Sequence, residues 1–364
     1  MKRIFTIIAI MAIIVAIPVI WYVSQKKGSA DNSVNKKVDN EVHQQEVINN
    51  PVQENNNEKE LDKVGWLQVN GSTIQNEKGE KIQLRGISSH GIAWFSDLIT
   101  YENLEYLKKE WNINVFRIAM YTDPNASGYI SNPELNKQKV NDIVEMAKSL
   151  DMYVIIDWHI LYDNNPQIYQ GQAKEFFDEM SKKYADTPNV IYEICNEPNG
   201  NDVKWDYNIK PYAEDIVGTI RANSPKSLVI VGTADWSKNV NEAADNPIND
   251  SNVVYTCHFY AGSHGKELQD KIDYCISKNI PVFVSECGIT DASGAGQIYE
   301  KEFRDWINYL NERNISWLFW SLSNKDEASS IFKPEYNPND NEDQDRNNYL
   351  SETGKIVKSI LSTY

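Results

Sequence analysis

Eight short β-rich runs alternate with helical patterns along most of this chain. The helical patterns, in which apolar residues recur three or four positions apart, are Glu134–Leu150, Gln172–Tyr184, Tyr207–Asn223, Glu267–Lys278, Gln297–Glu312 and Gly354–Leu361. The β-rich runs are Ile82–Ile87, Asn114–Met120, Tyr153–His159, Asn189–Glu197, Ser227–Gly232, Val253–Phe259, Pro281–Glu286 and Ser316–Leu322. This alternation predicts an α/β fold, a closed (β/α)8 barrel of the TIM type. A doubly wound sheet is the rival fold, but no G-x-G-x-x-G motif follows the first run.

A short β-hairpin is expected before the barrel. Its strands are predicted at Leu67–Val69 and Ile74–Asn76, with a turn at Asn70 and Gly71.

Polar and aromatic side chains gather where the β-rich runs end. The carboxyl ends of parallel strands form the active face of a barrel, so we expect these side chains to meet in one cleft. They are Ser89, His90, Arg117, Tyr121, Asp157, Trp158, His159, Asn196, Glu197, His258, Tyr260, Glu286 and Trp320.

Two of these run ends carry a glutamate. Glu197 closes NVIYEICNE, and Glu286 closes PVFVSE. A carboxylate at the end of a buried apolar strand costs free energy unless its charge or its proton is used there. Glycosidic cleavage needs such a pair, one carboxyl protonated to donate to the leaving oxygen and one ionised to attack the anomeric carbon. We therefore predict that Glu197 is the acid and that Arg117 and Tyr260 keep Glu286 ionised.

The formal charge of −16 at pH 7 bears on the partner. A strongly negative surface repels phosphate and uronate, so no nucleic-acid partner is expected and an uncharged substrate fits better. Ten Trp and twenty Tyr suit a protein that stacks sugar rings. Trp94, Tyr121 and Trp320 are the candidates for stacking, and packing in the core is the alternative for each.

The first 63 residues differ from the rest. Lys2 and Arg3 precede an apolar run over residues 4–23, and Lys26 and Lys27 follow it. Because this run is about as long as a bilayer-spanning helix, residues 1–27 are expected to be a signal peptide or an uncleaved membrane anchor. Residues 28–63 predict a disordered polar linker to a catalytic domain over 64–364. The protein is thus expected to be secreted or anchored to the outer face of the cell membrane.

Other chemistries stay open at this point. His159 and His258 are placed to orient the acid or to contact sugar hydroxyls, and hydrogen-bonded core histidines are the alternative. With five His and no H-x-H or H-E-x-x-H motif, no catalytic metal and no cofactor are expected. A thiol nucleophile is the alternative to small buried strand residues for the four cysteines, which are Cys195, Cys257, Cys275 and Cys287.

Seven motifs carry a resemblance to a known family. They are RGISSHG (85–91), VFRIAMYT (115–122), YVIIDWHIL (153–161), NVIYEICNEPNG (189–200), IKPYAEDIV (209–217), HFYAGSHG (258–265) and SECGITDASG (285–294). From about residue 65 onwards the chain resembles bacterial endoglucanases of glycoside hydrolase family 5, the secreted cellulases of Bacillus and clostridia. The resemblance implies a TIM barrel that hydrolyses internal β-1,4 bonds of glucan with retention at the anomeric carbon. We expect a monomer.

The resemblance also implies residue roles. Glu197, in the Asn-Glu-Pro motif, matches the family's acid/base, and Glu286 matches its nucleophile. The supporting set falls on Arg117, His159, Asn196, His258 and Tyr260. Substrate contacts fall on His90, Trp94, Phe95, Tyr121, His159, Tyr260, Ala292, Ser293, Trp320, Lys325, Asp326 and Glu327. Cys287 stands where relatives often have Trp, Asn324 where they have Asp, and Phe95 where they have Tyr, so substrate preference can differ.

Three alternatives remain for the function. One keeps the chemistry and changes the sugar to mannan, mixed-linkage glucan or xylan, since one cleft contact shifts preference by only ~1–3 kcal/mol. The others are a non-catalytic glycan-binding barrel on the cell surface and a metal-dependent hydrolase.

Overall fold

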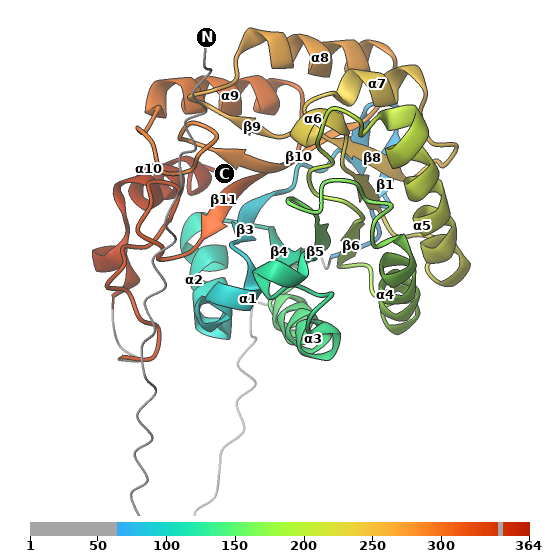
Figure 1. Cartoon of the computed structure of the whole chain (residues 1–364). Helices are drawn as coiled ribbons and strands as arrows, with labels where there is room; N and C mark the ends of the chain where they lie inside the picture. Colours follow the sequence, from blue (N-terminus) through green and yellow to red (C-terminus); the bar gives the residue numbers. More distant parts are fainter. Residues whose placement is uncertain (1–63, 341–344) are drawn as a thin grey trace, which may run out of the picture. The chain divides into compact units, whose positions relative to one another are not determined.

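Eight parallel strands close into a barrel that is surrounded by helices (Figure 1). The computed structural model describes residues 64–340 and 345–364, all within one compact unit. The barrel strands are β3 (Arg85–Ser89), β4 (Val115–Tyr121), β5 (Tyr153–His159), β6 (Val190–Glu193), β7 (Val229–Val231), β8 (Val253–Thr256), β10 (Val282–Gly288) and β11 (Trp317–Leu322). The sheet closes because β11 pairs in parallel with both β10 and β3. The predicted (β/α)8 barrel is confirmed.

The helices connect successive strands. They are α1 (Ile92–Phe95), α2 (Tyr101–Trp111), α3 (Pro133–Ser149), α4 (Gln170–Lys183), α5 (Lys210–Asn223), α6 (Ala234–Ser237), α7 (Val240–Asp245), α8 (Lys266–Ser277), α9 (Glu300–Glu312) and α10 (Glu352–Leu361). Short turns of other helix types are η1 (Ser96–Leu98), η2 (Pro124–Ala126), η3 (Trp205–Ile209) and η4 (Arg346–Tyr349). Sequence analysis did not anticipate α2, although Leu104, Leu107 and Trp111 line its buried face at helical spacing.

Successive residues of a barrel strand pack on opposite sides of the sheet. On β4, Val115 belongs to a small apolar cluster with inward residues of the neighbouring strands, and Phe116 belongs to the large cluster that includes the helices. Arg117 lies two residues beyond Val115 and so points into the barrel, closer to its carboxyl-end face. Strands β5 and β6 likewise begin with apolar side chains and end in polar or charged ones, His159 and Glu193.

The predicted N-terminal hairpin is present and packs against the small apolar cluster. Its strands are β1 (Gln68–Asn70) and β2 (Thr73–Gln75), one residue away from the predicted bounds on each side. Leu67 and Ile74 are buried in that cluster. Asn252 fastens the hairpin, because its Oδ1 accepts from the Val69 N–H at 2.9 Å and its Nδ2 donates to the Leu67 carbonyl at 3.0 Å.

Two of the differences between the predicted and the observed strands fall at the active face. Strand β6 ends at Glu193, so Glu197 lies four residues beyond the strand instead of closing it. Beyond Glu193 the backbone no longer forms regular strand pairing. The Glu197 N–H instead donates to the carbonyl of Ile160, in the segment after β5, at 3.3 Å. The predicted run Val253–Phe259 divides into β8 and the short β9 (Phe259–Tyr260), which pairs with the end of β10. His258 sits in the break.

The predicted signal or anchor (1–27) and the predicted linker (28–63) lie outside the described residues. Within 64–340 and 345–364, none of the helices combines the length and the apolar character that crossing a bilayer requires.

Candidate active site

A cleft of about 570 Å³ opens at the carboxyl ends of the barrel strands. It brings together most of the predicted site residues, which come from seven different strand ends or following loops. Those that line it are His90, Trp94, Tyr121, His159, Glu197, His258, Tyr260, Glu286, Ala292, Ser293, Trp320, Lys325 and Glu327. Arg117 and Asn196 lie beneath these residues, almost fully buried.

Arg117 on β4 is the centre of the buried charge network. Its Nε and Nη2 bind Glu193 at 2.7 and 3.0 Å, and its Nη2 also lies 3.1 Å from an oxygen of Asp157. Its Nη1 donates to Glu286 Oε2 at 3.2 Å. One buried guanidinium therefore contacts three carboxyls that come from three strands.

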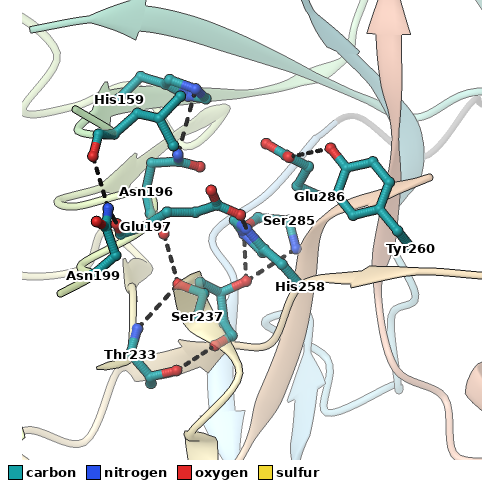
Figure 2. A network of polar contacts seen from close by, with 12 residues as sticks. His159, Asn196, Glu197, Asn199, Thr233, Ser237, His258, Tyr260, Ser285 and Glu286 are labelled. Atoms are coloured by element: carbon teal, nitrogen blue, oxygen red, sulfur yellow. Dashed lines mark hydrogen bonds and ion pairs between the residues drawn. The ribbon is translucent and has the colours of Figure 1, made fainter. Parts of the chain in front are cut away.

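Glu286 on β10 is held at both carboxyl oxygens. Arg117 binds Oε2, and the Tyr260 hydroxyl donates to Oε1 at 2.7 Å (Figure 2). Burial raises the pKa of Glu286, and the charge of Glu197 adds to this, while His258, Arg117 and His159 act in the opposite direction. Donors on both oxygens favour the ionised form of this carboxyl.

Glu197 has a different environment. Burial raises the pKa of Glu197 to about 8, with Arg117 the main opposing charge. Its Oε1 lies 2.9 Å from Nδ1 of His258, whose own pKa is lowered to about 4, chiefly by burial. At neutral pH this carboxyl therefore holds a proton and the imidazole beside it is uncharged.

One oxygen from each glutamate and one ring nitrogen of His258 all lie within 4.8 Å of one another. These three residues form the group in the described chain that could ligate a metal ion. The same proximity suits two carboxyls that act on one bond between them, so the trio combines a proton donor, an anion and a neutral imidazole in one place.

Hydrogen bonds to the Arg117 charge network fix the orientation of the His159 and Asn196 side chains. The His159 Nδ1–H donates to Asp157 at 2.6 Å, and burial lowers the pKa of His159 well below its usual value. Asn196 accepts from Arg117 Nη2 at 2.7 Å and donates to the Ile160 carbonyl at 3.1 Å. The Asn196 side chain thus ties the arginine cluster to the loop that carries Glu197.

Aromatic rings form one wall of the cleft. The Tyr121 ring lies 4.8 Å from Trp94 and 4.2 Å from His159, and His159 stacks on Trp320 at 5.4 Å between ring centres. Trp94 is 46% exposed and so offers a face to a ligand, whereas Tyr121 and Trp320 are mostly buried.

A charged group borders this wall. Lys325 pairs with Glu327, which also accepts from the Ser329 hydroxyl at 2.7 Å and lies 3.9 Å from His90. Two residues predicted to contact substrate do not line the cleft. Phe95 packs against the core with its ring 4.8 Å from His90, and Asp326 is exposed beside the lining residues.

The four cysteines are free and buried. Burial raises the pKa of the Cys195 and Cys287 thiols, and each thiol contacts a backbone carbonyl instead of the cleft. A buried thiol that keeps its proton is not a nucleophile, so the structure supports small buried residues over the thiol alternative.

Several lining residues were missed by sequence analysis. They are Leu161, Tyr162, Trp236, Lys238, His264 and Gly294. Tyr162 and Trp236 matter most because they are 78% and 44% exposed and can face a ligand. Trp236 sits in the middle of three successive residues with positive φ, Asp235 to Ser237. No turn motif in the sequence signals this conformation.

A parallel barrel with two buried carboxyls beside one cleft at its strand ends defines the class of TIM-barrel glycoside hydrolases. The family model of cellulase (glycosyl hydrolase family 5) matches residues 75–326. The chain belongs to glycosyl hydrolase family 5, which confirms the resemblance found in the sequence.

Curated relatives agree with this assignment. The chain is 53% identical over 260 residues to Endoglucanase A of Evansella cellulosilytica, a match that covers 71% of this chain and 53% of the relative. It is 51% identical over 269 residues to an endoglucanase of Clostridium saccharobutylicum, covering 74% and 59%. The chain therefore spans little more than half the length of these relatives.

Solved structures are similar over nearly the whole barrel. Cellulase Cel5C_n matches with a TM-score of 0.78 at 40% identity, covering 82% of this chain and 93% of that one. The catalytic domain of Thermobifida fusca endoglucanase Cel5A, in complex with cellotetraose, matches with a TM-score of 0.77 at 35% identity, covering 82% and 97%.

Proposed function

We propose that this protein is a retaining endo-β-1,4-glucanase in which Glu197 is the acid/base and Glu286 the nucleophile. The observation that carries the proposal is the unlike environment of two adjacent carboxyls. Glu286 has cationic and hydroxyl donors on its two oxygens, whereas Glu197 is buried beside a neutral imidazole. Environments that separate two carboxyls in this way assign one as acid and the other as anion.

The spacing of the pair supports retention. Retaining glycosidases place their carboxyls roughly 5–5.5 Å apart, and inverting enzymes leave roughly 6.5–9.5 Å for a water between them. One oxygen of Glu197 and one oxygen of Glu286 lie within 4.8 Å of each other, which is close to the retaining spacing. Direct attack by one carboxylate is then the step that this geometry favours.

In the first half of the reaction, Glu286 attacks the anomeric carbon while Glu197 gives its proton to the leaving oxygen. The hydrogen bonds from Arg117 and Tyr260 hold the Glu286 carboxylate in its orientation during attack. The negative charge of this carboxylate decreases as its bond to the sugar forms. In the second half, Glu197 takes a proton from water, and the hydroxide displaces Glu286 with net retention.

The substrate class follows from the cleft and from the relatives. The lining offers an exposed indole at Trp94 and another at Trp236, together with polar groups such as Lys325 and Glu327. Exposed rings suit the flat faces of a sugar chain, and the charged groups suit its hydroxyls. The named activity of the relatives and the cellotetraose in one similar structure favour β-1,4-glucan.

The test is an activity panel on the full-length protein. Release of reducing ends from carboxymethylcellulose, barley glucan, glucomannan and xylan is measured for the wild type and for Glu286→Gln. We expect the highest turnover on a β-1,4-linked glucan and its loss in the variant. Higher turnover on glucomannan or xylan would reassign the substrate, and glucan binding without hydrolysis would favour a binding barrel.

We also propose that the enzyme acts outside the cell as a monomer, exported or held at the membrane through residues 4–23. The proposed export depends on the apolar run and the basic residues that flank it. Fractionation of expressing cells, with protease added to intact cells, tests it. Activity that stays in the cytoplasmic fraction would contradict export, and a larger species in size-exclusion chromatography would contradict a monomer.

A further inference from the structure

Ser285, the residue before the proposed nucleophile, contacts three groups of the network. Its side chain is fully buried, and Oγ lies 2.7 Å from Glu193 Oε1 and 2.7 Å from the Thr256 hydroxyl. Oγ also lies 2.9 Å from His258 Nε2 (Figure 2). The pairing of β10 with β11 shifts in register between Val284 and Cys287, which lets both Ser285 and Glu286 reach the site. The mechanism above uses Glu286 and leaves Ser285 without a role.

Short contacts between oxygens decide where the Ser285 proton lies. Glu193 chelates the buried Arg117 guanidinium through both oxygens, so it is an ionised acceptor. An oxygen pair at 2.7 Å needs a hydrogen between its members, and Ser285 must therefore donate to Glu193. By the same argument Thr256 donates to Ser285, while the Thr256 oxygen accepts the Ser285 backbone N–H at 3.1 Å.

With its one proton committed, Ser285 Oγ can only accept from His258. Nε2 of His258 therefore carries a hydrogen. Since His258 is a neutral imidazole, its Nδ1 is then bare. Nδ1 lies 2.9 Å from Glu197 Oε1, and a bare nitrogen at that distance requires that the carboxyl be the donor.

We propose that Ser285 is a positioning residue that fixes the Nε2–H tautomer of His258 and so makes Nδ1 the acceptor for the proton of Glu197. This inference rests on the proposed function, in which Glu197 is the acid. The free site then holds the acid protonated, and substrate offers that proton a second acceptor, the glycosidic oxygen. After glycosylation the bare Nδ1 again favours the carboxyl that has regained a proton from water.

The tautomer can be read in the wild-type protein, and a variant is needed only to assign the signals. The full chain is labelled with ¹⁵N in its histidines, and the two ring nitrogens of His258 are assigned by comparison with His258→Gln. We expect a protonated Nε2 and a bare Nδ1 at pH 6 to 7. A protonated Nδ1 would overturn the proposal.

The kinetic test is the pH profile of kcat/KM in Ser285→Ala. Without its oxygen partner, the ring can take the Nδ1–H tautomer and donate to ionised Glu197, so the alkaline limb should move to lower pH by about one unit. Ser285→Thr keeps the hydroxyl, so its alkaline limb should lie at the same pH as that of the wild type. An unchanged limb in Ser285→Ala would contradict the role given to this hydroxyl.

Two comparisons show whether a shifted alkaline limb in Ser285→Ala comes from the lost hydroxyl. Ser227→Ala removes a buried hydroxyl that pairs with Ser224 at 2.6 Å before β7, at the opposite end of the barrel, and should leave the profile unchanged. On an aryl cellobioside with a dinitrophenyl leaving group, which needs no acid, Ser285→Ala should keep its glycosylation rate. Loss of that rate would indicate damage to Glu286 and would also contradict the proposal.

The same titratable neighbours stay in place in both serine variants, so a shifted limb reports on Ser285. The charged or titratable groups that face His258 and Glu197 are Arg117, Tyr121, Asp157, His159, Glu193, Lys238, Tyr260, His264 and Glu286. The outcome can be separated from failure of the proposed function. A wild type that cleaves no glucan refutes the function, whereas the tautomer measurement judges Ser285 without reference to turnover.

Discussion

Replacing Glu197 by glutamine should stabilise the fold by an amount that depends on pH. The pKa of this carboxyl is raised from its ordinary value of 4.5 to about 8, first by burial. Between these values the folded protein holds a proton that the unfolded chain releases, so the wild type loses stability as pH rises from 4.5 to 8. At about 1.36 kcal/mol per pH unit, this interval amounts to roughly 5 kcal/mol, an upper bound.

Glutamine mimics the protonated acid, because its amide N–H can donate to the bare Nδ1 of His258 as the carboxyl does. The difference in free energy of unfolding between Glu197→Gln and wild type should therefore be near zero at pH 4.5 and grow to a few kcal/mol by pH 9. Urea unfolding at intervals over this range measures the difference, and activity on glucan should fall by about 10²- to 10⁴-fold.

Glu175→Gln is the matched control, since it neutralises an exposed carboxylate on α4. Its effect on stability should be small and should not follow the curve of Glu197→Gln. A stability difference for Glu197→Gln that is the same at pH 4.5 and pH 9 would refute the reasoning.

Three further substitutions test separate parts of the account. Tyr260→Phe removes the donor to Glu286 Oε1 and should lower kcat by about 10²-fold with little change in KM, as steady-state kinetics on a soluble glucan would show. Trp236→Ala removes an exposed indole and should raise KM for long oligosaccharides by about 2- to 10-fold while sparing a short aryl cellobioside; equal effects on both would contradict a binding role. Asn252→Ala frees the hairpin and should lower the free energy of unfolding by about 2–4 kcal/mol without changing kcat, as measured by urea unfolding and turnover.

Much of the fold could be predicted because strands and helices each have a characteristic spacing of apolar residues along the sequence. Strands buried on both faces read as short apolar runs, and β5 has the predicted bounds, Tyr153–His159. Polar residues at the ends of such runs indicated the active face, since parallel strands end on one side. The same reasoning would have found Glu193, a charged residue inside the apolar run that ends in Glu197, but it was not singled out.

The remainder depends on contacts between distant segments. The register shift in β10 that turns both Ser285 and Glu286 toward the site arises from pairing with β11 and leaves no mark in the sequence. The left-handed turn at Trp236 is held by bonds such as that from its N–H to the Pro198 carbonyl, at 3.0 Å. The family resemblance assigned Phe95 to the cleft, whereas the structure packs its side chain against the core, with its ring 4.8 Å from that of His90.

The most direct test of the carboxyl pair is to trap the glycosyl-enzyme. The full-length protein is incubated with a 2-deoxy-2-fluoro-β-cellobioside that carries a dinitrophenyl leaving group, and its peptides are analysed by mass spectrometry. Attack by the carboxylate that Arg117 and Tyr260 hold predicts a single adduct, on Glu286. An adduct on Glu197, or rapid turnover to a product of inverted configuration with no adduct, would contradict the assignment.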